Sequence, residues 1–361
     1  MSKTLSIFIP SLEGGGAEKL MLALGAQIAA QGVFDRVDLV VANSKGSLAE
    51  SVPASLNLVN LCSRTPIRGA FRLAAYLRRA RPWCLLSTVQ SANVTALLSQ
   101  AITQSARKVV ICEANPTEFD LSEGSPSQRF LTKALIKTLY RRADLAIAIS
   151  ADVRWSLKHV AGVGESRIVT IPNPLLADHV ATPRSDTVLS RQRSIIACGR
   201  LQPQKDFPTL LRAFAIVRES TDVKLRILGE GPALPDLLRL ADLLGIGQHV
   251  EFLGYVGDPR RAMATATVFA HTARWEGFGL VLLEALASGC RVVATNCRGG
   301  VREVLEGGRF GRLVETGNPA EIASAILEAL DDDQPPPDGL AEHLAKYSLE
   351  SIALKYIDVL I

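Results

Sequence analysis

Two carboxylates and a glycine-rich turn in the second half of the chain have the types and spacing to bind the hydroxyl groups of a ligand. Glu276 opens the segment Glu276-Gly277-Phe278-Gly279-Leu280, and Glu284 follows after seven intervening residues. The segment lies where a predicted strand gives way to a helix. Gly277 and Gly279 therefore allow backbone N–H groups to approach a ligand oxygen, and the helix start favours negative charge. Carboxylates at such a turn are suited to accept hydrogen bonds from the hydroxyls of a sugar and a ribose.

A pair of cations stands at another strand–helix turn. Arg200 follows Gly199 directly after the predicted strand 194–198, and Lys205 lies five positions after Arg200, before a predicted helix. Two cations at the carboxyl end of a parallel strand suit a diphosphate. The alternative, that both are solvated loop cations, stays open.

A glycine-rich turn near the N-terminus joins the first predicted strand to the first predicted helix. It has the sequence Glu13-Gly14-Gly15-Gly16-Ala17-Glu18. This is not a Walker A loop, and Lys19 stands where a G-x-G-x-x-G pattern needs its last glycine. Consecutive glycines before a helix suit an anion, but a tight turn without a ligand explains them equally well.

These turns need parallel strands to position them, and the hydrophobic pattern predicts such strands. Short β-branched and aliphatic runs alternate with amphipathic stretches along nearly the whole chain, which indicates an α/β protein with doubly wound parallel sheets. Expected strands are 5–9, 37–41, 85–88, 108–112, 145–149, 194–198, 224–228, 250–253, 268–271, 292–295 and 311–314. Expected helices are 17–31, 69–80, 90–102, 126–142, 151–159, 207–218, 233–244, 259–265, 280–288, 299–305, 319–330 and 340–359.

A break in this alternation predicts two domains. Segment 172–193 holds Pro172, Pro174, Pro183 and a polar run, and is interpreted as a linker. We therefore expect a Rossmann-like domain over 1–177, joined by the last helix at 345–361, and a second Rossmann-like domain over 178–344. Two such domains would face a cleft at the carboxyl ends of their strands, where ligands bind in this architecture.

Length and composition exclude several other classes of protein. The chain has 361 residues, 48% of them hydrophobic and 21% charged, which is typical of a globular protein of about two domains. No apolar run approaches the roughly 20 residues of a membrane-spanning helix, and the N-terminus does not resemble a signal peptide. Six cysteines without a C-x-x-C pair indicate free thiols in a reducing cytosol and no zinc site. The Asp triplet at 331–333 is interpreted as a surface charge run and not as a metal-binding motif.

Basic residues are concentrated in the first half. Residues 1–177 carry 20 Lys and Arg against 12 Asp and Glu, a net charge of +8, whereas residues 178–361 carry 20 against 24, a net charge of −4. On the predicted helix 126–142, four cations recur at i, i+4 spacing and line one side: Arg129, Lys133, Lys137 and Arg141. Anionic lipid headgroups or a diphosphate-linked acceptor suit this face. Nucleic acid suits it less, because aromatic residues are not interleaved. A solvated helix face is the alternative.

Taken together, these segments resemble glycosyltransferase family 4 over nearly the whole chain. The segments that carry the resemblance are Gly15-Gly16-Ala17-Glu18, Gly199-Arg200-Leu201 with Lys205-Asp206, Gly229-Glu230-Gly231-Pro232, Glu276-Gly277-Phe278-Gly279 with Glu284, and Gly299-Gly300. The resemblance implies a retaining, metal-independent transferase with two Rossmann-like domains (the GT-B fold), of the subset that builds bacterial polysaccharides and glycans.

The resemblance also implies roles for individual residues. Arg200 and Lys205 would hold the donor diphosphate, Glu276 would contact the donor sugar, and Glu284 would bind the ribose. The turn 254–256 would read the base through its backbone, which suggests uracil. The implied donor-binding set is Gly15, Gly16, Gly199, Gly231, Tyr255, Val256, Gly277, Phe278, Gly279, Leu280 and Glu284.

One position departs from the family pattern. Many relatives place a His after the strand that ends here near Ile111, whereas this chain has Cys112-Glu113-Ala114-Asn115. Glu113 and Asn115 are therefore the acceptor-side candidates. His271 is interpreted as a hydrogen-bonded histidine at the end of a strand, without a catalytic role.

The sequence thus predicts a glycosyltransferase at the cytoplasmic face of a membrane, attached peripherally. It would move a hexose or N-acetylhexosamine, with retention, from a nucleotide sugar to a lipid-linked saccharide in surface polysaccharide or glycan assembly. The expected donor is a UDP-linked sugar. No cofactor or metal is expected beyond the donor. The rival hypotheses are a sugar-nucleotide 2-epimerase of the same fold and a non-catalytic nucleotide-sugar-binding protein.

Overall fold

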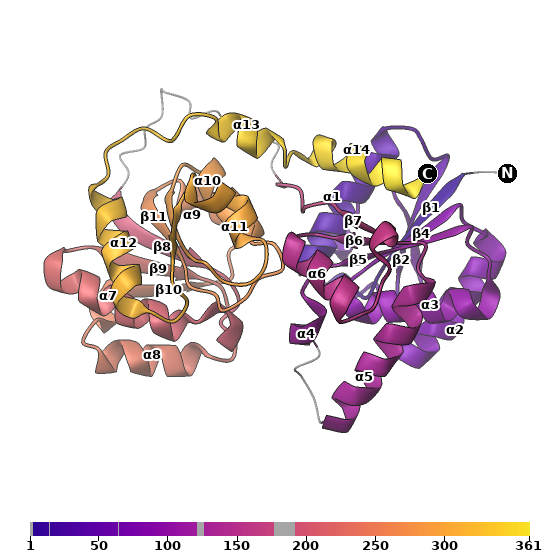
Figure 1. The fold of residues 1–361 in the computed structure, drawn as a ribbon, viewed down its shortest axis with the longest axis horizontal. Helices are drawn as coiled ribbons and strands as arrows, with labels where there is room; N and C mark the ends of the chain where they lie inside the picture. The colour runs from indigo at the N-terminus through magenta and orange to yellow at the C-terminus, as the bar shows by residue number, and fades with distance from the viewer. Residues whose placement is uncertain (1–2, 14, 64, 121–125, 177–191) are drawn as a thin grey trace. The chain divides into compact units, whose positions relative to one another are not determined.

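The computed structural model describes residues 3–13, 15–63, 65–120, 126–176 and 192–361, which divide into two compact units (Figure 1). The first unit is formed by residues 1–177 together with 346–361, and the second by residues 178–345. Gly14 of the N-terminal turn and most of the expected linker 172–193 lie outside the described residues.

The first unit is built on a seven-stranded parallel sheet in the order β3-β2-β1-β4-β5-β6-β7. Its strands are β1 (Thr4–Ile9), β2 (Arg36–Val41), β3 (Asn57–Asn60), β4 (Cys84–Thr88), β5 (Lys108–Glu113), β6 (Leu145–Ala148) and β7 (Ile168–Thr170). Its helices are α1 (Gly16–Ala30), α2 (Pro66–Ala80), α3 (Gln90–Thr103), α4 (Thr117–Asp120), α5 (Pro126–Leu139), α6 (Ala151–His159) and α14 (Leu349–Leu360). The sheet is fully buried at its centre, as the apolar runs of β1 and β4 require.

The second unit repeats the plan with six parallel strands in the order β10-β9-β8-β11-β12-β13. Its strands are β8 (Gln192–Cys198), β9 (Lys224–Leu228), β10 (Val250–Gly254), β11 (Ala266–His271), β12 (Arg291–Thr295) and β13 (Arg312–Val314). Its helices are α7 (Phe207–Ser220), α8 (Leu234–Leu243), α9 (Pro259–Met263), α10 (Leu280–Ala287), α11 (Val301–Val304), α12 (Pro319–Asp331) and α13 (Leu340–Ala345). Short 3₁₀ turns follow α5 at Tyr140–Arg142 (η2) and β8 at Pro203–Lys205 (η4).

Both units show the doubly wound α/β fold that the alternation of patterns predicts. In each sheet the chain starts near the middle and extends first to one side and then to the other, so that β1 neighbours β4 and β8 neighbours β11. Loops at the carboxyl ends of such neighbouring strands diverge and leave room for ligands. Gly199 and Arg200 follow β8, and His271 ends β11, so these residues lie at that edge of the second sheet.

The structure corrects two features of the expected secondary structure. Strands β3 and β7 were not predicted, because both are short edge strands without a continuous buried run. The single final helix expected at 340–359 is wrong. It is two helices, because the Ser348 side chain accepts a hydrogen bond from the Ser351 N–H and starts α14 anew.

The last helix completes the first unit. Helix α14 packs beside α1, and the hydroxyl of the fully buried Tyr356 lies 3.3 Å from the Cys112 Sγ at the end of β5. Just before α14, the Tyr347 carbonyl accepts a 2.7 Å hydrogen bond from the Leu175 N–H. The C-terminal 16 residues therefore pack with the sheet formed by residues 1–177.

Candidate functional site

Three side chains meet at the carboxyl edge of the second sheet. Lys205 at the end of η4 forms an ion pair with Glu276 Oε1, and the same oxygen lies 2.8 Å from His271 Nε2. The three side chains are 16%, 9% and 3% exposed, respectively. A carboxylate, an ammonium group and an imidazole are thus held together in a nearly dry setting, where charge interactions are stronger than at an exposed surface.

The surroundings of Glu276 keep its carboxyl group ionised. Burial alone raises the pKa of Glu276, but the charge of Lys205 and hydrogen bonds from His271 and Lys205 outweigh burial and lower the pKa to about 2. Because an ionised carboxylate only accepts hydrogen bonds, His271 Nε2 must carry the proton and donate it.

The loop that carries Lys205 is fastened to the loop that follows β11. The Thr272 hydroxyl donates to the Lys205 carbonyl at 3.0 Å. The Arg274 N–H donates to the Gln204 carbonyl at 2.8 Å, and the Gln204 side chain donates to the Trp275 carbonyl at 3.0 Å. These bonds join residues about 70 positions apart, so the backbone itself presents Lys205 to Glu276.

The glycines near Glu276 have a packing role that the sequence did not disclose. A Cβ atom on Gly299 would lie 1.9 Å from the Glu276 carbonyl oxygen, and one on Gly300 would lie 2.6 Å from the Phe278 carbonyl oxygen. Only glycines allow the 298–300 loop to lie this close to the 276–278 backbone. Gly279 has a φ of 90° and is the N-cap residue of α10. Gly277, the buried Phe278 and Leu280, the first residue of α10, complete the turn.

The remaining predicted donor residues of the second unit lie near the same strand ends. Glu284 is half-buried one turn inside α10. It lies close enough to Cys198, the last residue of β8, for its charge to add to burial in raising the pKa of that thiol to about 12. Arg200 is exposed two residues after Cys198, and Gly199 lies between them.

The predicted base-reading turn is held by its neighbours. The Gly229 N–H donates to the Gly254 carbonyl at 2.7 Å, and the Tyr255 N–H donates to Glu230 Oε1 at 3.3 Å. A Cβ atom on Gly231 would lie 2.4 Å from the Leu201 carbonyl oxygen, so this glycine too serves close backbone packing. The ring of Tyr255 is exposed and Val256 is half-buried.

The predicted N-terminal phosphate turn lies in the first unit. Gly15 caps α1 without a side-chain hydrogen bond, and a Cβ atom on Gly16 would meet nothing within 4 Å. Neither glycine has a positive φ. Packing and backbone conformation therefore do not require glycine at position 16.

The two acceptor-side candidates differ in accessibility. Glu113 is fully buried at the end of β5, where its Oε2 accepts a 2.6 Å hydrogen bond from the Tyr140 hydroxyl and lies 3.4 Å from Asn93 Nδ2. Asn115 is half-buried two residues later. These contacts join η2 and α3 to the sheet through Glu113. They favour a structural role for Glu113 over direct contact with an acceptor.

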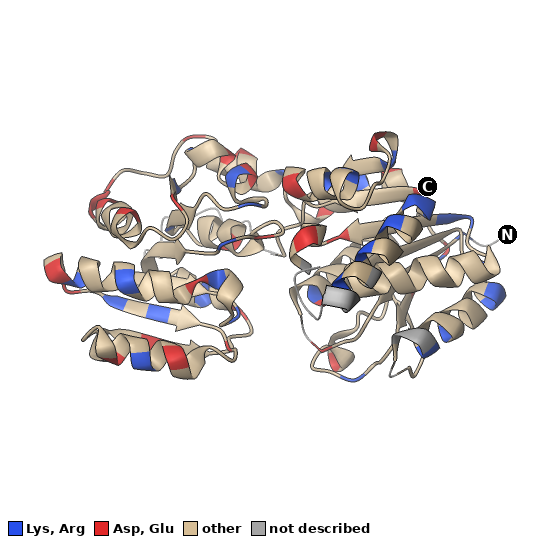
Figure 2. Ribbon diagram, turned by 60° about the horizontal axis from the view of Figure 1, so that its bottom comes forward, with Lys and Arg blue, Asp and Glu red and all other residues tan. Residues whose placement is uncertain are grey.

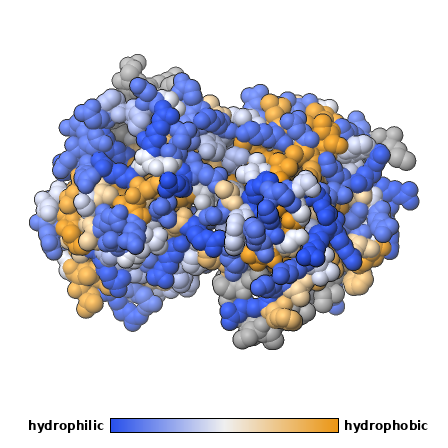
Figure 3. Space-filling view, viewed as in Figure 1, coloured by the Kyte–Doolittle hydropathy of each residue, from blue (hydrophilic) through white to orange (hydrophobic). Residues whose placement is uncertain are grey.

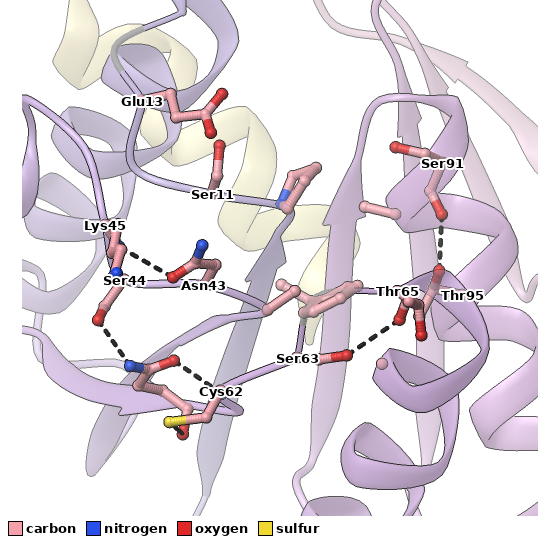
Figure 4. Close-up of a pocket in the computed structure, with 16 residues that line it drawn as sticks. Ser11, Glu13, Asn43, Ser44, Lys45, Cys62, Ser63, Thr65, Ser91 and Thr95 are labelled. Atoms are coloured by element: carbon pink, nitrogen blue, oxygen red, sulfur yellow. Dashed lines mark hydrogen bonds between the residues drawn. The ribbon is translucent and has the colours of Figure 1, made fainter.

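A cavity of about 650 Å³ lies at the carboxyl ends of β1, β2 and β3, within the first unit (Figure 4). Hydroxyls, amides and two charged groups line it, among them Ser11, Glu13, Asn43, Lys45 and Ser91. Several lining groups are fixed by local bonds, such as that from Asn60 Nδ2 to Ser44 Oγ at 2.6 Å. Sequence reasoning missed this cavity, although Ser11, Asn43 and Ser63 each follow a predicted or observed strand by a few residues.

The basic row lies on the surface of the first unit. Arg129, Lys133, Lys137 and Arg141 are all exposed, and blue bands recur along α5 in Figure 2. The neighbouring Phe130 is 76% exposed. Hydrophilic residues otherwise cover much of the face seen in Figure 3, with smaller hydrophobic patches between them.

Within the described residues, no group of three or more His, Cys, Asp and Glu side chains is placed to hold a metal ion. None of the helices in the described ranges is both long and apolar enough to cross a bilayer.

Family models match both units. The model described as Glycosyltransferase Family 4 matches residues 14–177, and the model described as Glycosyl transferases group 1 matches residues 192–332. The chain belongs to glycosyltransferase family 4. The predicted family is confirmed, and so is the prediction that the protein is a transferase.

Two curated relatives of this glycosyltransferase have names that specify a lipid or a lipid-linked saccharide as substrate. It is 28% identical over 340 residues to the N-acetylgalactosamine-N,N'-diacetylbacillosaminyl-diphospho-undecaprenol 4-alpha-N-acetylgalactosaminyltransferase of Campylobacter jejuni, an alignment that covers 91% of each chain. It is 33% identical over 187 residues to a phosphatidyl-myo-inositol mannosyltransferase of Mycolicibacterium smegmatis, which covers 50% of this chain and 46% of that relative.

Solved structures share the fold of this glycosyltransferase over its whole length. The sucrose-phosphate synthase of Thermosynechococcus elongatus aligns with a TM-score of 0.81 at 18% identity and covers 99% of this chain and 98% of its own. HepE of Anabaena, solved with UDP and glucose, aligns with a TM-score of 0.78 at 21% identity and covers 100% of this chain and 99% of its own. These neighbours confirm the predicted fold class of two Rossmann-like units.

Proposed function

We propose that the second unit binds a uridine diphosphate sugar as the glycosyl donor. The observation that carries this proposal is the buried Lys205–Glu276–His271 cluster at the carboxyl edge of β8 and β11. An ionised, nearly buried carboxylate beside a glycine-rich turn suits sugar hydroxyls, and nearby cations suit a diphosphate. Uridine is proposed because HepE, which shares the fold, was solved with UDP and with UDP-glucose.

Each part of the donor has a proposed contact. Arg200 and Lys205 bind the diphosphate, and Glu276 accepts from sugar hydroxyls, with Phe278 and Gly279 donating backbone N–H groups. Glu284, one turn inside α10, accepts from the ribose hydroxyls. The turn 254–256 contacts the base. The sugar is proposed to be a hexose or N-acetylhexosamine, because the Campylobacter jejuni relative is named as an N-acetylgalactosaminyltransferase.

The proposed reaction is substitution with retention. The bond between the anomeric carbon and the diphosphate oxygen breaks, and an acceptor hydroxyl oxygen bonds to the same face of that carbon. The departing diphosphate takes the hydroxyl proton, while Arg200, Lys205 and the N-terminus of α10 stabilise its charge. No metal ion is required in this scheme. The anomeric configuration of the product, read from its proton NMR coupling constant, tests retention.

The cavity of the first unit is proposed to receive the saccharide of a lipid-linked acceptor. Its hydroxyl, amide and charged lining suits a polyhydroxylated group, and its volume falls within the usual range of ligand sites. Cys62 reports on it directly, because it lines the cavity and is exposed, whereas the other five cysteines are buried or half-buried. Acceptor saccharides should slow alkylation of Cys62 by iodoacetamide, and an unchanged alkylation rate at saturating acceptor would contradict this assignment.

The basic row is proposed to dock the protein on an anionic membrane surface, where a lipid-linked acceptor resides. Each cation near an anionic leaflet contributes about 1 kcal/mol, and the attraction is screened by salt. The protein should therefore sediment with anionic vesicles at low salt and be released at high salt. A Lys133→Glu/Lys137→Glu/Arg141→Glu variant should lose docking while it keeps UDP binding.

A matched variant makes the vesicle experiment specific. Arg212, Lys224 and Arg239 are exposed cations of the second unit, and changing all three to Glu alters the net charge equally. This control should still sediment with vesicles. If both triple variants lose docking to the same extent, overall charge and not the α5 row is responsible.

Calorimetric titration with nucleotides tests the donor proposal. UDP and UDP-sugars should bind more tightly than GDP and GDP-sugars, and Glu284→Gln should weaken UDP binding. The half-exposed Glu251 provides a matched Glu→Gln control that should bind UDP normally. Equal affinity of UDP for the Glu284 variant and the unaltered protein would refute the ribose contact. Incubation with UDP-sugar alone, read for an epimer, distinguishes transfer from 2-epimerisation.

A further inference from the structure

We propose that His271 is a positioning residue that keeps the Glu276 carboxylate in place when the donor diphosphate engages Lys205. This inference rests on the proposed function, because it takes Glu276 as the contact to the donor sugar. It assigns a role to His271, which the sequence analysis interpreted only as a hydrogen-bonded histidine at the end of a strand.

Only the side chain of Glu276 is free to change direction. Its N–H donates to the Arg298 carbonyl at 2.9 Å, and its own carbonyl oxygen is packed against Gly299. The backbone is therefore fixed on both sides. The direction of the carboxylate is set by the two groups that contact Oε1, which are Lys205 Nζ and His271 Nε2.

Those two groups differ in how firmly they are held. Lys205 ends in a flexible chain with a charged tip, and the proposed donor brings a diphosphate that competes for that tip. His271 is the last residue of β11, a strand that lies between β8 and β12. In the ladder between β11 and β12, His271 pairs with Ala294. A short side chain on a central strand is a more precise support than a lysine on a loop. His271 therefore keeps its hold on Oε1 when Lys205 turns to the diphosphate.

Among the described residues, the bond to Glu276 Oε1 is the one hydrogen bond that the His271 ring makes. His271 is buried, and its Nδ1 has no hydrogen-bond partner among the described residues. The nearby Cys297 thiol brings no competing charge, because burial and the charge of Glu276 raise its pKa to about 12. A buried imidazole with a single bond, made to the proposed sugar-binding carboxylate, is explained by the orientation of that carboxylate.

Three substitutions separate orientation from simple packing. His271→Leu keeps the apolar volume and removes the donor, and His271→Gln restores an N–H near the position of Nε2. His271→Asn is too short to reach Glu276. Each variant is measured for kcat with UDP-sugar and acceptor, for the dissociation constant of UDP, and for its melting temperature.

The expected pattern is specific to a positioning role. The Leu and Asn variants should lose about 10- to 100-fold in kcat, as misplaced catalytic groups do, while the Gln variant recovers most of it. UDP should bind all three within about twofold of the unaltered protein, because UDP carries no sugar for Glu276 to contact. This comparison does not depend on the stability of any one variant.

Two results would overturn the inference alone. One is a kcat of the Leu variant within about twofold of the unaltered protein. The other is an equal loss of kcat in the Gln and Leu variants, together with weaker UDP binding, which indicates a packing role. If the unaltered protein binds no nucleotide, the proposed donor site is itself wrong, and this inference is wrong with it.

Discussion

Removal of the Lys205 charge should destabilise the second unit through Glu276. In Lys205→Met the side chain keeps most of its length but loses its ammonium group. The nearly buried carboxylate of Glu276 then has no ammonium group beside it. Burial is the largest single influence on Glu276 and acts to raise its pKa, so without Lys205 that influence should prevail. The carboxyl group then takes up a proton or remains charged at a cost.

The size of the effect follows from the pKa of Glu276. Its pKa falls from an ordinary 4.5 to about 2 in the folded protein. This difference corresponds to about 3 kcal/mol of stability, which is present above pH 4.5 and is lost as the pH falls toward 2. Lys205→Met should therefore lower the free energy of unfolding at pH 7.5 by roughly 2–4 kcal/mol, in line with other broken buried pairs.

Urea unfolding of the unaltered protein, of Lys205→Met and of two comparison variants tests this reasoning. Trp275 is the one tryptophan within residues 178–345, and its fluorescence follows this unit. Lys224 pairs with Glu251 at 2.8 Å, with side chains 61% and 41% exposed, so Lys224→Met should cost at most about 1 kcal/mol. The double variant Lys205→Met/Glu276→Gln should be more stable than Lys205→Met. If Lys205→Met resembles Lys224→Met at every pH, the buried pair does not carry the charge interaction described here.

Other expected outcomes concern single residues and the metal requirement. Gly299→Ala should destabilise the second unit by more than about 2 kcal/mol in the same urea assay, because its φ is 121° and its Cβ would meet a backbone oxygen. Gly16→Ala should change stability by no more than about 1 kcal/mol, and a larger loss would reveal a packing role for this glycine. Glu113→Gln should cost about 1–2 kcal/mol in thermal unfolding and leave the KM for the acceptor unchanged, whereas a raised KM would restore Glu113 as an acceptor contact. Dialysis against EDTA should leave the transfer rate unchanged. A rate that falls on dialysis and recovers only when Mg²⁺ is added would contradict metal independence.

The sequence predicted the elements that carry a strong local signal. The buried central strands and the helices between them followed from continuous apolar runs and helical periodicity, as β1, β4 and β11 illustrate. Edge strand β3 could not be predicted this way, because its residues Asn57–Asn60 are mostly exposed and polar at both ends. The break before α14 depends on a single cap at Ser348, which an amphipathic pattern conceals.

The site was predictable as a set of residues but not as a geometry. Lys205 and Glu276 were both identified from their turns, yet their ion pair depends on hydrogen bonds between loops about 70 residues apart. The role of Gly299 as a packing residue depends on the path of the Glu276 backbone, which no local pattern contains. His271 was set aside for the same reason, because its partner is fixed by the turn that follows β11.

Transfer by the Glu276→Gln variant tests the central claim most directly. The assay measures movement of a labelled sugar from a UDP-sugar to a polyprenyl-diphosphate-linked saccharide, with Glu251→Gln as the matched control. The unaltered protein and the control should transfer the sugar at the same rate. The Glu276 variant should lose about 100-fold or more in kcat, as expected when a group that stabilises the transition state is removed. Transfer by the Glu276 variant within about twofold of the unaltered rate would contradict the assignment of this carboxylate to the donor sugar.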